Sequence, residues 1–98
     1  MCGIVGIVQP NDKVGSASNT IAEMTASLAH RGPDEQGVWQ SSDQVLSLGH
    51  RRLSIIDLSS AGWQPFMSKD NNFAVVFNGE IYNQRQIRKE LLKSFDLN

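Results

Sequence analysis

Features common in secreted, membrane and metal-binding proteins are scarce in this sequence. It contains one cysteine and three prolines among 98 residues. No disulfide can therefore form within the chain, and no cluster of residues has metal-ligand spacing. The apolar stretch at the start is too short for the core of a signal peptide, and no apolar run is long enough to span a membrane. We therefore expect a protein of the reducing cytoplasm, with no metal site and no membrane partner.

A surplus of basic residues is also missing. Nine Lys and Arg residues face ten Asp and Glu residues, which gives a net charge of −1. Without a basic surplus to neutralise phosphates, nucleic acid is not expected as a partner. The chain is 40% hydrophobic and 19% charged, which is typical of a globular protein and not of a disordered one. Its length suits one domain with one core.

Two stretches are predicted to be strands that are covered on both faces. Residues 2–8 and residues 73–77 carry apolar side chains at both parities, a pattern typical of strands in the middle of a layered structure. A third strand is predicted from Leu46 onward, where apolar residues alternate with Ser and Gly. Its apolar parity switches to Leu53 and Ile55 after two arginines, and this switch predicts a bulge.

Two helices are predicted from their end signals. Thr20 and Glu23 fit a capping box, and the first helix should end near Ala29 or His30, before Gly32 and a proline. The second helix should follow a cap at Asn83. Its predicted buried stripe consists of Ile87, Leu91 and Phe95.

Cys2 is the first candidate for chemistry. Removal of Met1 would place a thiol and an α-amino group on the same residue. Their reference pKa values are about 8.5 and 7.7–8.0, so moving the proton from sulfur to nitrogen costs only about 1 kcal/mol. A base this close activates a nucleophile without a separate histidine. The alternative interpretation is a small buried residue that opens a strand, the usual position of an unpaired cysteine.

Three further segments allow both a functional and a structural interpretation. In the polar turn at residues 30–37, His30 could act as a base and Arg31 as an anion clamp, but we favour a role in fixing the turn. The arginines at positions 51 and 52 are either surface charge or ligands of a substrate carboxylate. Asn78 and Gly79 form either a hairpin turn or an oxyanion hole, with one side-chain amide and one backbone N–H as donors.

Taken together, five stretches resemble the glutaminase domain of class II glutamine amidotransferases, and the asparagine synthetase branch most closely. Each motif alone is weak, but the five occur in the family's order and extend over the whole chain. They are Met1–Gly6, His30–Asp34, Arg52–Asp57, Gln64–Pro65 and Phe77–Asn83.

The resemblance implies an α+β fold that is part of a four-layer α-β-β-α N-terminal-nucleophile hydrolase sandwich. Residues 1–98 would form the N-terminal portion of the glutaminase domain. The implied reaction is hydrolysis of glutamine to glutamate and ammonia through a glutamyl thioester. By motif position, the implied catalytic residues are Cys2 as nucleophile, with Asn78 and Gly79 as oxyanion hole. The implied substrate-binding residues are Arg52 for the α-carboxylate, Leu53, Ile55 and Ile56 along the pocket, and Glu80 at the α-amino end.

The resemblance also implies a downstream synthetase domain as the partner that receives the ammonia. No cofactor is expected in this part, because ATP and magnesium would serve only the synthetase domain. The family's glutaminase domain continues beyond the position of Asn98, so we expect the 98-residue chain alone to be weakly active or inactive. Two alternatives stay open: a non-catalytic binding or assembly module, and another amide-cleaving hydrolase of the same nucleophile type.

Overall fold

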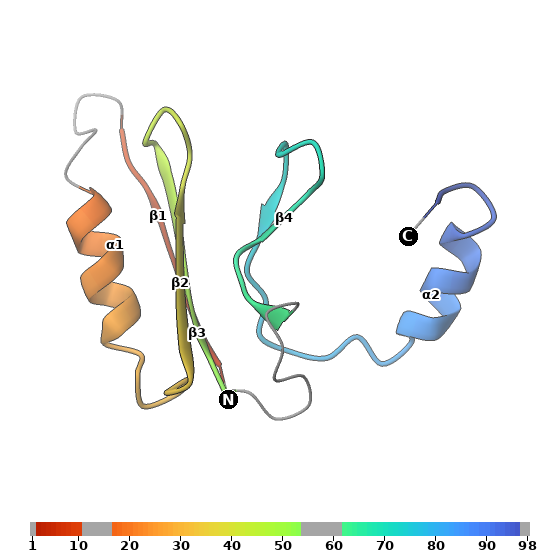
Figure 1. Cartoon of the computed structure of the whole chain (residues 1–98), viewed down its shortest axis with the longest axis horizontal. Helices are drawn as coiled ribbons and strands as arrows, with labels where there is room; N and C mark the ends of the chain where they lie inside the picture. The colour runs from red at the N-terminus through yellow and green to blue at the C-terminus, as the bar shows by residue number, and fades with distance from the viewer. Residues whose placement is uncertain (1, 11–16, 54–61, 97–98) are drawn as a thin grey trace.

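The computed structural model describes residues 2–10, 17–53 and 62–96, and these form an α+β fold with antiparallel sheets. The elements are β1 (Gly3–Val8), α1 (Ala17–Ala26), β2 (Glu35–Gln40), β3 (Leu46–Arg52), β4 (Phe66–Met67), β5 (Ala74–Val75) and α2 (Gln84–Leu91). One sheet has the order β1-β3-β2, and β4 pairs with β5 in a second. Helix α1 covers one face of the first sheet, and the β4–β5 ribbon lies on the opposite side (Figure 1). The predicted α+β class is confirmed, and the four-layer sandwich stays a prediction.

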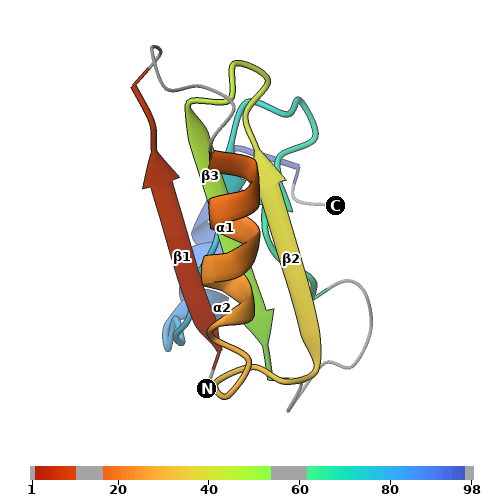
Figure 2. The same cartoon turned by 90° about the vertical axis from the view of Figure 1, so that its left-hand side faces the viewer.

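The register of the three-stranded sheet decides which side chains share a face. Gly3 lies opposite Arg51, and Glu35 lies opposite Arg52. Because side chains alternate along a strand, Arg51 is on the face of α1, and Arg52 is on the other face together with His50. Figure 2 shows α1 running along the middle of the sheet, over the central strand β3.

Close packing between α1 and β3 forms the core. Ile21 is 1% exposed, and Thr25 is fully buried with its hydroxyl donating to the Ile21 carbonyl at 2.6 Å. A side chain at Gly49 would place its Cβ 2.0 Å from Thr25 Oγ1. The small residues of β3, Ser47 and Gly49, therefore face the helix because the two backbones approach closely there.

One prediction for this region is wrong, and a second is tested only as far as Arg52. Helix α1 begins at Ala17, so Thr20 lies inside it and not at its cap. Strand β3 pairs without interruption from Leu46 to Arg52, so the predicted bulge is absent from this range. The small residues that alternate with the leucines of β3 reflect the approach of α1, and Leu53 already lies beyond the end of the strand.

The predicted double covering of two strands is not observed among the described residues. On β1, Val8 is 77% exposed on the face away from α1. Strand β5 is limited to Ala74–Val75, and Phe73 beside it is 74% exposed. Both stretches are apolar, but within the described part of the chain only α1 forms a full layer over a face of the sheet.

Helix α2 follows Asn83, as predicted, but Asn83 makes no side-chain cap hydrogen bond. No residue of α2 is buried, and the helix packs against none of the other described elements (Figure 1). The predicted buried stripe is therefore exposed: Ile87, Leu91 and Phe95. No described helix is long and apolar enough to cross a membrane.

Candidate active site

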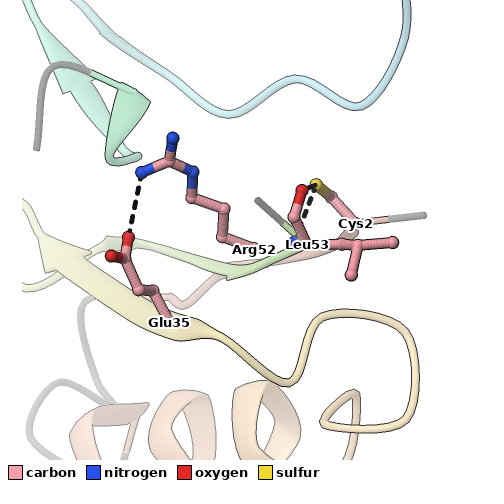
Figure 3. Close-up of polar contacts among 4 residues, drawn as sticks. All are labelled: Cys2, Glu35, Arg52 and Leu53. Carbon is pink, nitrogen blue, oxygen red and sulfur yellow. Dashed lines mark hydrogen bonds and ion pairs between the residues drawn. The ribbon is translucent and has the colours of Figure 1, made fainter. Parts of the chain in front are cut away.

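Cys2 lies immediately before β1, beside the residue that follows β3. The Leu53 backbone N–H donates to the Cys2 sulfur at 3.4 Å, and the sulfur lies 4.0 Å from the Leu53 carbonyl oxygen (Figure 3). The thiol is half-buried. The structure thus brings together two segments that are 51 residues apart in the sequence, both of which were predicted to contribute to one site.

Arg52 lies on the same sheet face as Cys2. It is 6% exposed, and its Nη1 lies 3.1 Å from Oε2 of Glu35 on the neighbouring strand β2 (Figure 3). The guanidinium also packs against Gly62, where an added Cβ would lie 2.5 Å from Nη2. The buried cation is therefore held in a defined orientation by an ion pair and by close packing.

Two further arginines, Arg31 and Arg51, bind mainly backbone carbonyls. Arg31 Nε donates to the Cys2 carbonyl at 3.2 Å, which fixes the residue before β1 from the α1 side. Arg51 Nε donates to the Gly32 carbonyl at 2.7 Å, and its Nη1 donates to Gln36 at 2.9 Å. Both arginines therefore fix the polar turn at residues 30–37: Arg31 ties it to Cys2, in agreement with the structural interpretation, and Arg51 ties it to β3.

His50 is a buried titratable residue of the central strand β3. It is 2% exposed, lies two residues before Arg52 on the same face, and forms a hydrogen bond with the Phe77 backbone. Burial lowers the pKa of His50 below its ordinary value of 6.5, the Arg52 charge lowers it further, and the bond to Phe77 partly offsets both effects. These effects favour the neutral form of the imidazole.

Asn78 and Gly79 lie in the exposed connection between β5 and α2. A helix follows them, so the hairpin interpretation is wrong. Phe77, the residue before them, donates its backbone N–H to Gln64 Oε1 at 2.6 Å. Its ring lies close to Gly79, where an added Cβ would be 3.0 Å from the ring. The structure therefore links Asn78 and Gly79 to the sheet through Phe77.

The predicted site residues are thus placed to different degrees. Cys2 and Leu53 are in contact, and Arg52 shares their face of the sheet. Glu80 is exposed in the same connection as Asn78 and Gly79, and these three are joined to the sheet only indirectly. Ile55 and Ile56 lie outside the described residues. Within the described ranges, no three Cys, His, Asp or Glu side chains gather closely enough to hold a metal ion.

Three residues near the candidate site were not assigned a role in it from the sequence: Glu35, His50 and Gln64. The parity of His50 with Leu46, Leu48 and Arg52 could have placed it on this face of β3. Glu35 becomes relevant only through its register with Arg52. Gln64 matters because its side chain holds Phe77, a contact that no local pattern predicts.

Comparison with known proteins connects this geometry to a family. A model of the glutamine amidotransferase domain matches residues 1–96. A probable glutamine-hydrolysing asparagine synthetase of Dictyostelium discoideum is 38% identical over 94% of this chain, and asparagine synthetase 1 of Bacillus subtilis is 40% identical over 93%. Amidase chry2 of Gibberella zeae is 40% identical over 97%. The chain spans 16%, 14% and 16% of the lengths of these relatives. With the family model matching nearly every residue, the chain belongs to the glutamine amidotransferase domain family.

Proposed function

We propose that this chain carries the nucleophile and part of the substrate clamp of an enzyme that hydrolyses glutamine to glutamate and ammonia. The observation that supports this most directly is the contact between the Cys2 sulfur and the Leu53 backbone. It places the only thiol of the chain next to the segment that holds Arg52, a buried cation suited to a carboxylate. Family membership and the names of the relatives point to the same reaction.

The proposed chemistry begins after removal of Met1. The α-amine of Cys2 takes the thiol proton, and the thiolate attacks the side-chain amide carbon of glutamine. The Asn78 side-chain amide and the Gly79 N–H donate to the oxyanion that forms, a contribution worth about 2.7–4 kcal/mol for one donor. The C–N bond then breaks, and the amine returns its proton to the departing ammonia. Water attacks the resulting thioester, which releases glutamate and restores the thiol.

Recognition of glutamine would use both of its charged ends. Arg52 binds the α-carboxylate, and each charge-assisted hydrogen bond contributes about 1.5–3 kcal/mol when buried. Main-chain groups around Leu53, Ile55 and Ile56 line the pocket, and Glu80 holds the α-amino group.

At the level of the whole protein, the proposal extends to a synthetase domain that uses the ammonia. The relatives named as asparagine synthetases support this extension. It includes completion of the four-layer sandwich by further strands, with ATP and magnesium serving the synthetase domain only.

The test uses the full natural chain, with N-terminal mass analysis to verify removal of Met1. Glutamine hydrolysis is measured together with labelling of Cys2 by an electrophilic glutamine analogue. The first variant is Cys2→Ala. In the second, an alanine inserted before Cys2 keeps the thiol but displaces the amine, and we expect a loss of about 10²- to 10⁴-fold. Equal activity of the insertion variant would refute the terminal amine as the base.

A second candidate function is cleavage of an amide other than glutamine, which the 40% identity to amidase chry2 favours. Labelling of Cys2 without preference for the glutamine analogue would support this candidate. An unreactive Cys2 in a processed, folded chain would instead support a non-catalytic module.

A further inference from the structure

Phe77 is held at its backbone by two side chains from distant parts of the chain. Its N–H donates to Gln64 Oε1 at 2.6 Å, and the His50 imidazole forms a second hydrogen bond with its backbone. Among the described residues, Nε2 of His50 has no hydrogen-bond partner, so the variants below test Nδ1 as the nitrogen that bonds to Phe77. These two bonds fix one residue of an otherwise exposed connection.

Both side chains come from well-anchored positions. His50 is buried on the central strand β3, and its partner in the register on β2 is Gly37. An added Cβ at Gly37 would lie 1.8 Å from the Gln64 carbonyl oxygen. The Gln64 backbone therefore rests directly on β2, next to the strand that carries His50.

The position of Phe77 also affects the two residues that follow it, Asn78 and Gly79. The Phe77 ring lies against Gly79, with the closest ring carbon 3.0 Å from the position of an added Cβ. Asn78 and Gly79 belong to no helix or strand, so no ladder of backbone hydrogen bonds orients them. Phe77 is their structural connection to the sheet that carries Cys2.

We propose that His50 and Gln64 are positioning residues that orient the oxyanion hole formed by Asn78 and Gly79 through their shared hold on Phe77. This inference rests on the proposed function, because it assigns a role within the same site. Oxyanion donors must lie about 2.7–3.1 Å from the developing charge, and loss of one lowers kcat by about 10²- to 10³-fold. Asn78 and Gly79 lack secondary structure, so hydrogen bonds from other segments are needed to hold their donors at that distance.

The test compares pairs of variants in the full natural chain. In His50→Asn, the amide N–H occupies the place of Nδ1 and keeps the bond to Phe77. In His50→Gln, it occupies the place of Nε2 and loses the bond. Gln64→Glu keeps an acceptor for the Phe77 N–H, and Gln64→Leu removes it. Ser47→Ala is the control, because Ser47 is buried on the same strand but faces α1.

Two measurements are made on each variant: the kinetics of glutamine hydrolysis and amide hydrogen exchange over residues 76–80. We expect His50→Gln and Gln64→Leu to lower kcat by about tenfold or more, with little change in KM, since the oxyanion exists only in the transition state. Exchange should accelerate in the same two variants. His50→Asn, Gln64→Glu and Ser47→Ala should stay near the parent chain in both measurements.

Two results would overturn the proposal. One is equal loss of kcat in the members of each pair, because the retained bond would then have no effect. The other is faster exchange with unchanged kcat, which would show a hold on Phe77 without catalytic consequence. If the parent chain does not hydrolyse glutamine at all, the proposed function fails, whatever the exchange data show. Unchanged amide exchange in His50→Gln and Gln64→Leu would refute the hold on Phe77 itself.

Discussion

Adjacent arginines on β3 have different surroundings because side chains alternate along a strand. Arg51 points to the face of α1 and binds the carbonyl of Gly32. Arg52 points to the face of Cys2, is buried, and pairs with Glu35. Only the second arginine is therefore placed to act on a ligand near the thiol. Strand register thus separates the two arginines onto opposite faces, and binding of a substrate carboxylate by Arg52 stays a prediction.

The first prediction separates a substrate-binding role of Arg52 from a structural one. Arg52→Lys keeps the charge but loses the planar fork. In the full natural chain we expect KM for glutamine to rise about 10- to 150-fold, the equivalent of one charge-assisted hydrogen bond of about 1.5–3 kcal/mol. The change in kcat should be smaller.

The matched control is Arg51→Lys, one residue away on the opposite face. It should leave KM for glutamine near the parental value, with any loss appearing in thermal stability because Arg51 fixes the polar turn. An equal rise in KM for both variants would contradict a direct role of Arg52.

The second prediction concerns pH and two exposed carboxylates. Asp43 and Asp70 each accept hydrogen bonds from a serine hydroxyl and a backbone N–H, and these bonds lower their pKa below 3.8. Because the folded value is the lower one, the stabilisation is complete above the unfolded pKa and is lost as pH falls through the folded pKa. We expect Asp43→Asn to lower the free energy of unfolding at pH 7. The difference from the parent chain, measured by denaturant titration, should shrink below about pH 4. A difference that stays constant down to pH 2 would contradict this origin.

At the level of elements, the same turn closes both strand pairs. In the β2–β3 turn, the Ser41 hydroxyl donates to Asp43 and accepts from the Leu46 N–H, and in the β4–β5 turn Ser68 bonds to Asp70 and Phe73 in the same way. Each turn also has one non-glycine residue with positive φ. It is Gln44 at 62° in the first turn and Asn71 at 59° in the second. The two turns differ in how well this residue suits the left-handed region.

The third prediction uses this difference. Asparagine tolerates the left-handed region better than glutamine, because its short side chain bonds locally. We expect Gln44→Asn to raise the free energy of unfolding by about 0.5–1 kcal/mol. The reciprocal Asn71→Gln should lower it by a similar amount. Chemical unfolding monitored by circular dichroism measures both, and stabilisation by Asn71→Gln would contradict the argument.

Local patterns predicted some elements well and failed where distant contacts decide. The apolar run after Cys2 indicated β1, and Asn83 marked the start of α2. Thr20 fitted a capping box, yet the helix begins three residues earlier. For the candidate site, the motifs named Cys2 and Arg52. The roles of Glu35, His50 and Gln64 depend on register and on contacts across layers, which periodicity along one strand does not encode.

For the whole molecule, the distribution of apolar surface is informative. On one side of the sheet, α1 buries its apolar face against β1 and β3. On the other side, large apolar side chains of β1, of the β4–β5 ribbon and of α2 are exposed: Ile4, Val8, Phe73, Val75, Phe77, Ile87, Leu91 and Phe95. Exposed apolar surface on this scale is unusual for an isolated soluble domain. Within the described residues, this side of the sheet is therefore only partly covered.

The fourth prediction follows from this surface. We expect the 98-residue chain to hydrolyse glutamine far more slowly than a full-length asparagine synthetase relative such as that of Bacillus subtilis, or not at all. Asn78, Gly79 and Glu80 lie in the exposed connection to a helix that packs on no other described element, so on the helix side nothing described holds them in place. The same chain should associate with itself or bind a hydrophobic dye, because its apolar face is open. Parallel glutaminase assays and light scattering of both chains measure these outcomes. Equal turnover by the two chains, with a monodisperse monomer of the short one, would show that the described elements suffice to build the site.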